Sequence, residues 1–342
     1  MRALQLVDQV GVENLRVVDL PDPVPGPYEV LVRMRAVSLN YRDLLMVGGV
    51  YRGATPLPLT PFSDGCGVVE AVGPGVSRFV PGDRVSTLFF QKWLGGRSTR
   101  ESQNSALGMP IPGAGRELAT FHEDGLSKVP AFLSDHQVST LACAALTAWR
   151  ALFEDARLQP GDTVLLQGTG GVSIFGLQFA SAAGYRTIVT SSSDEKLERA
   201  RALGADHLIN YRTTPDWGAA ARALTGGRGV DFVMEVGGAG TLTQSLRAIG
   251  LMGHIAIIGV LGGPAEPLQM GSMITTGARL QGVQVGSRAM FEAMCRAIKL
   301  QQICPVVDKV FPFTEARAAF EAMRKGEHFG KIVLEFPAGS HA

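Results

Sequence analysis

The sequence lacks the features that mark membrane-spanning, secreted or disulfide-rich proteins. No apolar run in its 342 residues is long enough to cross a bilayer. The first residues enter a strand-like pattern without the apolar core of a signal peptide. The four cysteines lie far apart and form no CxxC pair. These absences predict a cytoplasmic protein with reduced thiols.

The chain also has a small net charge and lacks metal-binding histidine motifs. A formal net charge of +1 gives no reason to expect nucleic acid or an anionic membrane as a partner. The six histidines show no HxxxH or HExxH spacing, so none of them indicates a metal site. Hydrophobic residues make up 46% of the chain and charged residues 18%, which favours compact folding. The length suits two domains.

The most informative segment that is present spans residues 163–184. An apolar, β-branched run ends in Gly168-Thr169-Gly170-Gly171-Val172, and an amphipathic segment follows from Ile174 to Ala183. This order predicts a strand, a glycine turn and a helix. Such a turn lets the backbone approach a pyrophosphate, whose charge lies on the free N–H groups of the helix. The sequence therefore predicts a dinucleotide site, with Ser173 where a third glycine is usual.

The pattern of predicted secondary structure changes twice along the chain. Short strands separated by proline and glycine fill the first third, strands and helices alternate from about Leu126, and the tail returns to the first style. We expect an α/β protein in which a Rossmann domain with a parallel sheet is inserted into a discontinuous, mostly β catalytic domain. The expected boundaries are 1–129, 130–276 and 277–342. A helix is predicted over Ser134–Phe153, and a long loop over Gln91–Gly115.

Several dispersed motifs resemble the medium-chain dehydrogenase/reductase superfamily, whose catalytic domain is GroES-like. They are PGDRV at 81–85, LTAW at 146–149, PGDTVLLQGTGGV at 160–172, LGAD at 203–206, INYR at 209–212 and GKIVL at 330–334. The resemblance covers nearly the whole chain. Because these motifs occur in the same order as in the superfamily, together they are more specific than any single motif.

The resemblance also implies that both zinc sites of this superfamily are absent. Zinc enzymes begin the catalytic site with a cysteine where this chain has Asn40, and Ser63 and Asp64 match their histidine and glutamate. Only Cys143, at the third position, is a typical ligand. A catalytic zinc needs three good protein ligands and an open position. Residues 84–115, where the structural zinc would be held, contain no cysteine.

The segment around Asn40 looks instead like the zinc-free quinone oxidoreductases and their enoyl-reductase relatives. There a tyrosine follows the asparagine by about eleven residues, and Gly49-Val50-Tyr51 supplies it. The resemblance makes Tyr51 the candidate proton donor. Asn40 is a candidate to bind the substrate oxygen or the nicotinamide ribose, and Tyr41 is a candidate pocket residue. Packing roles remain open for both tyrosines, and a turn-forming role for Asn40.

The end of the second Rossmann strand bears on the choice of cofactor. NAD enzymes place a carboxylate there, and Ser191 matches that position. The predicted binding set for the adenosine 2′-phosphate is Ser191, Ser192, Ser193, Lys196, Tyr211 and Arg212. The prediction is NADPH rather than NADH. An alternative for part of this set is a capping box of Ser192 with Glu195, with Lys196 as a solvated helix residue.

Further cofactor contacts come from the resemblance alone. They are Thr147, the run Gly259-Val260-Leu261, the pair Ser287-Arg288, and Phe329 with Lys331. Ordinary solvated charges remain the alternative for Arg288 and Lys331. Asp64 is expected to pair with Arg42 or to hold a water, and Cys143 to act as a buried hydrophobe.

The leading hypothesis is NADPH-dependent, zinc-independent hydride transfer to a quinone or an α,β-unsaturated carbonyl, since these delocalise charge onto oxygen. An alcohol dehydrogenase or aldehyde reductase of the same superfamily is the enzyme alternative. An NADPH-binding protein with little turnover is the alternative from another class. The partners expected are a small carbonyl or quinone and a second copy of the chain, with Leu280–Val285 as an edge strand for dimerisation.

Overall fold

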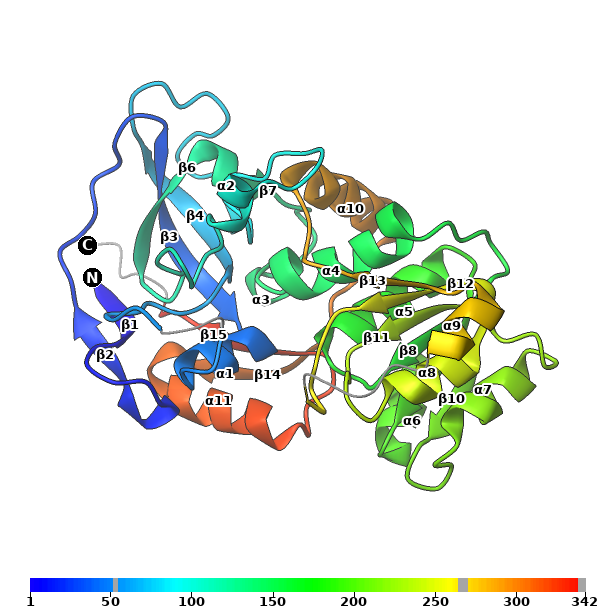
Figure 1. The fold of residues 1–342 in the computed structure, drawn as a ribbon. Coiled ribbons are helices and arrows are strands. Elements are labelled where there is room, and N and C mark those ends of the chain that lie inside the picture. The colour runs from blue at the N-terminus through cyan, green and yellow to red at the C-terminus, as the bar shows by residue number, and fades with distance from the viewer. Residues whose placement is uncertain (52–54, 264–269, 338–342) are drawn as a thin grey trace. The chain divides into compact units, whose positions relative to one another are not determined.

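A computed structural model describes residues 1–51, 55–263 and 270–337. The chain divides into two compact units (Figure 1). Unit 1 comprises Met1–Leu146 and Val285–Ala342, and unit 2 comprises Thr147–Gln284. Within the described ranges, no helix combines the length and apolar character that a bilayer crossing needs.

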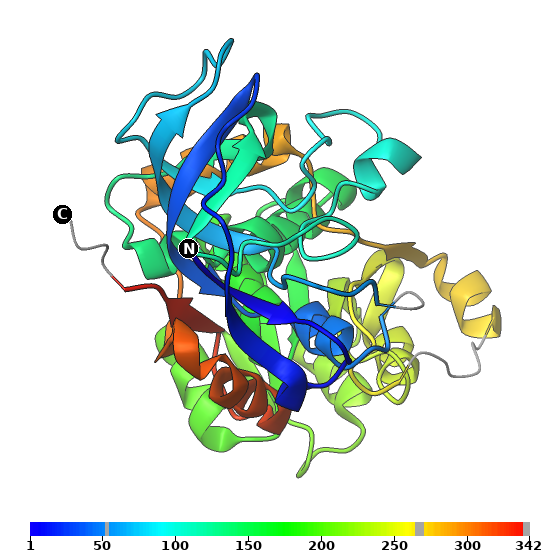
Figure 2. The same cartoon turned by 90° about the vertical axis from the view of Figure 1, so that its left-hand side faces the viewer.

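Unit 1 is built on a seven-stranded sheet in which antiparallel pairing dominates. The strand order is β14-β15-β3-β4-β5-β7, and β6 pairs with β3. The strands are β3 (Glu29–Ser38), β4 (Asp64–Val72), β5 (Arg84–Thr87), β6 (Leu118–His122), β7 (Leu126–Lys128), β14 (Val307–Pro312) and β15 (Lys331–Glu335). A separate hairpin of β1 (Arg2–Leu6) and β2 (Leu15–Asp19) lies beside the N-terminus (Figure 2). Alternation along β3 buries every second side chain, which is the pattern of a strand with one face on a core.

The helices of unit 1 are short except for two near the C-terminus. They are α1 (Tyr41–Val47), α2 (Arg100–Gln103), α3 (Asp135–Val138), α10 (Arg288–Gln301) and α11 (Ala316–Lys325). Aromatic residues of α11 and the segment before it, Phe320 and Phe313, are fully buried in the core under β3 and β15. The polar segment 91–115, predicted to be a loop, contains only the single turn of α2.

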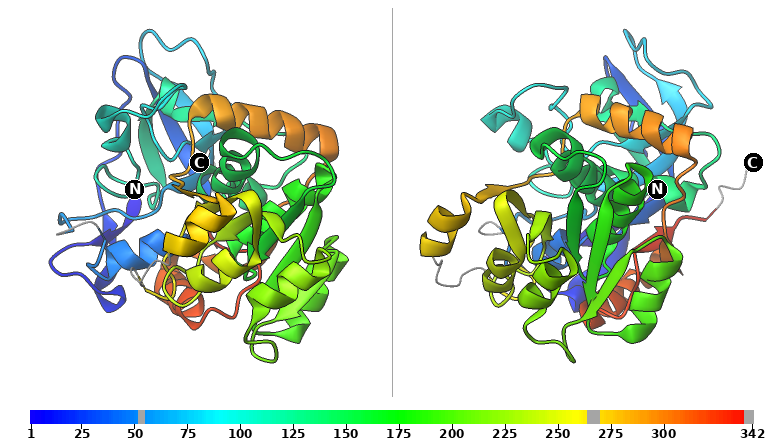
Figure 3. Two further views of the ribbon diagram at one scale, coloured as in Figure 1. Left: turned by 45° about the vertical axis from the view of Figure 1, so that its right-hand side comes forward. Right: turned by 90° about the vertical axis from the view of Figure 1, so that its right-hand side faces the viewer.

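Unit 2 contains a six-stranded parallel sheet with the strand order β10-β9-β8-β11-β12-β13 (Figure 3). The strands are β8 (Thr163–Gln167), β9 (Arg186–Ser191), β10 (His207–Asn210), β11 (Val230–Glu235), β12 (Ile249–Ile257) and β13 (Arg279–Gly282). In chain order this is 3-2-1-4-5-6, the order of the Rossmann fold. The strand order changes direction between β8 and β11, because β9 and β10 follow on one side of β8 whereas β11 to β13 follow on the other. Ligands of such sheets bind beyond the carboxyl ends of the strands at this point.

The helices of unit 2 connect the parallel strands. They are α4 (Leu146–Trp149), which begins at the boundary, α5 (Gly171–Ala182), α6 (Asp194–Ala202), α7 (Trp217–Leu224), α8 (Leu242–Ala248) and α9 (Met270–Thr276). Right-handed crossovers place α5 and α6 on one face of the sheet and α7, α8 and α9 on the other. Accordingly α7 packs on α8, and α8 packs on α9.

Two features differ from the sequence prediction. In sequence the units are divided at 146/147 and 284/285, where boundaries at 129/130 and 276/277 were expected. The first boundary lies later because α3 and the turn Leu141–Ala145 pack on β3 and β4. The helix expected over Ser134–Phe153 is divided into short α-helical and π-helical turns. β13 lies at the edge of its sheet, as predicted, but covers Arg279–Gly282 and is only partly buried.

Candidate functional site

The glycine turn of unit 2 has the geometry that a pyrophosphate requires. Gly168 adopts φ +71°, a left-handed conformation that favours glycine. Gly170 precedes α5, and none of the described atoms would lie within 4 Å of a Cβ added at either glycine. No side chain in the described ranges caps α5, so its first N–H groups remain available for an anion. Ser173 replaces the third glycine and donates its hydroxyl to the carbonyl of Gln167 at 2.6 Å.

A buried carboxylate next to this turn organises the loop after β11. Glu235 is 0% exposed and accepts hydrogen bonds from Gln167 Nε2 at 2.7 Å and from the hydroxyl of Thr241 at 2.6 Å. It also accepts the backbone N–H groups of Gly237 and Gly238. Because β8 and β11 are neighbours, their last residues meet and fix this loop beside the glycine turn. Sequence reasoning missed this network, although a polar residue ending each of two apolar strands was the available signal.

The end of β9 brings some of the predicted 2′-phosphate residues together. The backbone N–H of Tyr211 donates to the carbonyl of Ser191 at 3.0 Å, since β9 and β10 pair in register there. Ser193 caps α6 by accepting from the N–H of Lys196. The alternative prediction of a capping box formed by Ser192 with Glu195 was therefore wrong, because the residue that caps α6 is Ser193. The side chains of Tyr211 and Arg212 remain exposed to solvent.

In unit 1, Lys331 occupies a place that the sequence analysis did not expect. Its side chain is 3% exposed, and Nζ donates to the carbonyl of Leu39 at 2.5 Å and to Oδ1 of Asn40 at 2.6 Å. Asp64 Oδ2 lies 4.0 Å from the same Nζ. The ends of β3, β4 and β15 meet here, because Ser38 pairs with Asp64 on one side and with Val333 on the other. We call Lys331, Asn40 and Asp64 the lysine cluster.

Burial dominates the electrostatics of the lysine cluster. It raises the pKa of Asp64, which the nearby Lys331 ammonium opposes, and it lowers the pKa of Lys331, which Asp64 opposes. The hydroxyls of Ser38 and Ser63 donate to the Asp64 carboxylate at 3.3 and 3.0 Å. Burial also raises the pKa of the Cys143 thiol, which suits the expected hydrophobic role.

Asn40 presents a buried amide donor in the same cluster, and its side chain opposes the rise that burial causes in the pKa of the nearby Asp64 carboxyl. Its backbone N–H donates to the carboxylate of Asp43 at 2.8 Å, which anchors the start of α1. Its side-chain oxygen accepts from Lys331, and this contact defines which end of the amide is oxygen. Nδ2 is buried and has no hydrogen-bond partner among the described residues. Burial raises the pKa of Asp43 to about 6.

Asp64 does not pair with Arg42, contrary to the expectation from sequence. The Arg42 guanidinium instead donates to the carbonyls of Leu107 and Met109 at 2.9 and 3.3 Å. It also lies over the rings of Tyr51 and Phe89, 5.2 and 4.6 Å from their centroids. The reason is that α1 directs Arg42 toward the segment 107–109, whereas Asp64 faces the end of β15. Tyr51 is partly buried against the core, and Tyr41 is 41% exposed.

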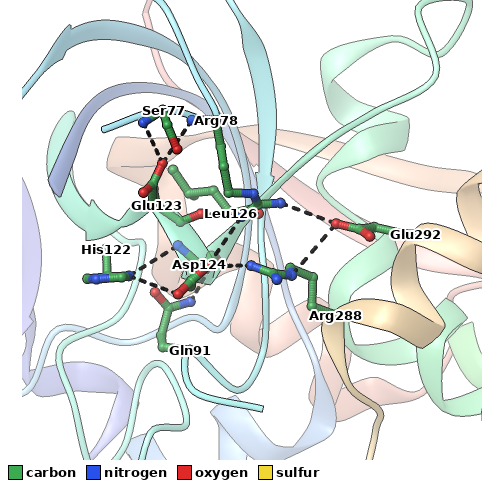
Figure 4. A network of polar contacts seen from close by, with 10 residues as sticks. Ser77, Arg78, Gln91, His122, Glu123, Asp124, Leu126, Arg288 and Glu292 are labelled. Atoms are coloured by element: carbon green, nitrogen blue, oxygen red, sulfur yellow. Dashed lines mark hydrogen bonds and ion pairs between the residues drawn. The ribbon is translucent and has the colours of Figure 1, made fainter. Parts of the chain in front are cut away.

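Arg288 belongs to a polar network within unit 1 (Figure 4). Its guanidinium donates to Asp124 at 2.5 Å, while Arg78 contacts Glu292 at 3.2 Å. Glu292 follows Arg288 by one turn of α10. Ser287 caps α10 by accepting from the N–H of Met290. These contacts give Arg288 and Ser287 structural partners, and Arg288 is not the solvated charge that the sequence alternative described.

The remaining predicted residues have simpler surroundings. Thr147 is buried in α4, and Phe329 is buried just before β15. Val260 and Leu261 are about half exposed, on a loop held to the β11 loop by the bond from Leu261 N to Val236 O. Among the residues that the structure describes, no group of three or more His, Cys, Asp or Glu side chains could hold a metal ion.

Comparisons with known proteins agree with this fold. Residues 26–131 match the family described as "Alcohol dehydrogenase GroES-like domain", and residues 171–299 match "Zinc-binding dehydrogenase". A zinc-type alcohol dehydrogenase-like protein of Schizosaccharomyces pombe is 44% identical over 91% of both chains. A 2-haloacrylate reductase of a Burkholderia species is 31% identical over 91% of both chains.

Solved structures show the same similarity. A protein of Sinorhizobium meliloti described as a possible alcohol dehydrogenase is 42% identical, with a TM-score of 0.91 over 98% of this chain and 99% of that one. An NAD-dependent alcohol dehydrogenase is 35% identical, with a TM-score of 0.91 over 99% and 100%. A mycobacterial protein complexed with NADPH is 28% identical, with a TM-score of 0.83 over 98% and 100%.

The Rossmann sheet and its open glycine turn, next in sequence to a GroES-like unit, define the fold of an oxidoreductase. The chain belongs to the medium-chain dehydrogenase/reductase superfamily.

Proposed function

We propose that this protein is an NADPH-dependent, zinc-independent reductase of quinones or α,β-unsaturated carbonyls. The observation that carries the proposal is the buried Lys331 ammonium, which is bonded to Asn40 and lies 4.0 Å from Asp64. Asn40 and Asp64 match two ligand positions of the zinc enzymes. The Lys331 ammonium at these positions would repel a divalent metal ion. The lysine cluster therefore supplies positive charge without zinc.

The same cluster suits the chemistry of an enone or a quinone. A nicotinamide, when bound, supplies the hydride, and negative charge develops on the carbonyl oxygen of the acceptor. Nδ2 of Asn40 is a fixed donor for that oxygen, since Lys331 holds the amide by its other end. Tyr51, beside the Arg42 guanidinium, is the proposed proton donor.

The preference for NADPH rests on the end of β9, where Ser191 stands in place of a carboxylate and its carbonyl accepts the backbone N–H of Tyr211. We expect Ser191→Asp to lower kcat/KM with NADPH at least tenfold and to raise kcat/KM with NADH, because a carboxylate repels the 2′-phosphate and binds the 2′-hydroxyl. Initial rates with both cofactors measure the switch. Ser181→Asp, near the C-terminal end of α5 and outside the predicted binding set, is the matched control and should leave the ratio unchanged. An unchanged ratio in Ser191→Asp would contradict the assignment.

The experiment that tests the proposed function is NADPH oxidation with trans-2-hexenal, followed by product analysis. The proposal expects saturated hexanal, formed at full rate by protein that is free of zinc by elemental analysis. The allylic alcohol, or an activity that requires near-stoichiometric zinc, would overturn it.

Carbonyl reduction is the second candidate function. Cys143 lies in the π-helical turn Leu141–Ala145, which packs on β4, the strand that begins at Asp64. The similarity to alcohol dehydrogenases favours this candidate. Tight NADPH binding without turnover on any acceptor would instead favour a binding protein.

We also propose that the protein is a cytoplasmic homodimer. Among the described strands, β13 is an edge of the unit 2 sheet. Leu251, Met252 and Ile274, on the neighbouring β12 and α9, are at least 77% exposed. A second copy would pair its own β13 there and cover these side chains. Light scattering should give twice the mass of 36.3 kDa, and a monomer would refute the dimer.

A further inference from the structure

A cavity in unit 1 is not used by the proposed reaction. It has a volume of about 450 Å³, which is within the range of small-molecule sites, and residues between Gln91 and Asp124 line it. Its apolar wall includes Leu94, Leu107, Ile111 and Phe121. Gln91, His122 and Asp124 of its polar wall are visible in Figure 4.

Arg116 lines this cavity and has no counterion among the residues that the structure describes. Its Nε is buried and has no hydrogen-bond partner in the described part of the chain. Burial lowers the pKa of Arg116, and no carboxylate opposes that effect. The adjacent Glu117 is unavailable, because Arg2 binds it through the backbone N–H at 2.7 Å and through the guanidinium at 2.7 Å.

Both carboxylates that line the cavity have other cationic partners. Glu101 lies 3.0 Å from Lys92. Asp124 accepts from Arg288 at 2.5 Å, within the network of Figure 4. The charges within these ion pairs therefore cancel each other. The Arg116 guanidinium then gives the lining of the cavity one excess positive charge. A buried or half-buried arginine in proteins is normally paired, so its missing partner points to a ligand.

We propose that this cavity binds a small amphipathic carboxylate, with the carboxylate on Arg116 and the hydrocarbon chain against Leu107, Ile111 and Phe121. A guanidinium binds a carboxylate through two parallel N–H bonds, and the apolar wall removes the chain from water. This binding does not depend on the proposed function, because it needs neither a nicotinamide nor a reducible group.

Isothermal titration calorimetry of the full-length protein with sodium hexanoate tests the proposal. Hexanamide is the neutral probe of the same length. We expect saturable binding of hexanoate, at least tenfold weaker binding of hexanamide, and at least a tenfold loss of hexanoate affinity in Arg116→Gln. Arg116→Lys should fall in between, since it keeps the charge and loses the two-bond geometry. No saturable binding, or equal affinity of both probes, would overturn the proposal.

A matched variant separates the specific contact from a general loss of charge. Arg33 is a partly exposed arginine of β3 that pairs with Glu70 outside the cavity, so Arg33→Gln should leave hexanoate affinity unchanged. Without ligand, Arg116→Gln should unfold at the same temperature as the parent protein or higher, because it removes an uncompensated charge. A lower unfolding temperature together with unchanged affinity would assign Arg116 a structural role. Hexanoate has no reducible bond, so a negative result leaves the proposed reductase activity untouched.

Discussion

Lys331→Met is expected to destabilise the protein by about 3–5 kcal/mol, because it leaves the Asp64 carboxylate buried without its cation. It should also lower kcat/KM on the order of 10²–10³-fold, because Asn40 loses the contact that orients its amide. Chemical denaturation measures the first effect, and steady-state rates with the active acceptor measure the second.

A second substitution separates these two effects. Lys331→Met combined with Asp64→Asn removes both charges, so the double variant should regain most of the lost stability. Its activity should stay low, since neither asparagine nor methionine holds Asn40. Lys309→Met, at an exposed position of the neighbouring β14, is the control and should change neither quantity. Recovery of activity together with stability would show that Lys331 acts only through folding.

Gly170→Asp is expected to abolish productive NADPH binding while the fold remains intact. Gly170 has φ −79°, which any residue adopts, and none of the described atoms would lie within 4 Å of its Cβ. An aspartate there caps α5 and slightly stabilises the helix. The carboxylate would lie where the pyrophosphate must bind, and like charges in contact cost several kcal/mol. We therefore expect NADPH affinity to fall by about two orders of magnitude or more.

Fluorescence titration with NADPH measures this loss, and thermal unfolding measures the stability. Gly271→Asp is the matched control, because Gly271 also lies in the first turn of a helix of unit 2 and none of the described atoms would lie within 4 Å of its Cβ. This control should leave NADPH affinity unchanged. Full affinity in Gly170→Asp would exclude the start of α5 as the pyrophosphate site.

The sequence determined the class of fold because its signals are local. The glycine turn is one example, since strand, turn and helix are contiguous from Thr163 to Ala182 and need no distant contact. The alternating pattern of β3 and the parallel strands of unit 2 followed in the same way. Local patterns also placed Ser191 and Tyr211 at strand ends, because Ser191 is the last residue of β9 and Tyr211 directly follows β10.

The tertiary structure alone decided which charges lie together. Lys331 and Asn40 are 291 positions apart, and they meet because β15 pairs with β3. No sequence pattern connects Arg288 with Asp124. Nor does the sequence reveal that Glu117 binds Arg2 rather than the adjacent Arg116. A side chain's charge is visible in a sequence, whereas its burial and its counterion depend on how separate strands and loops pack. That dependence is why the fold was predictable and the lysine cluster was not.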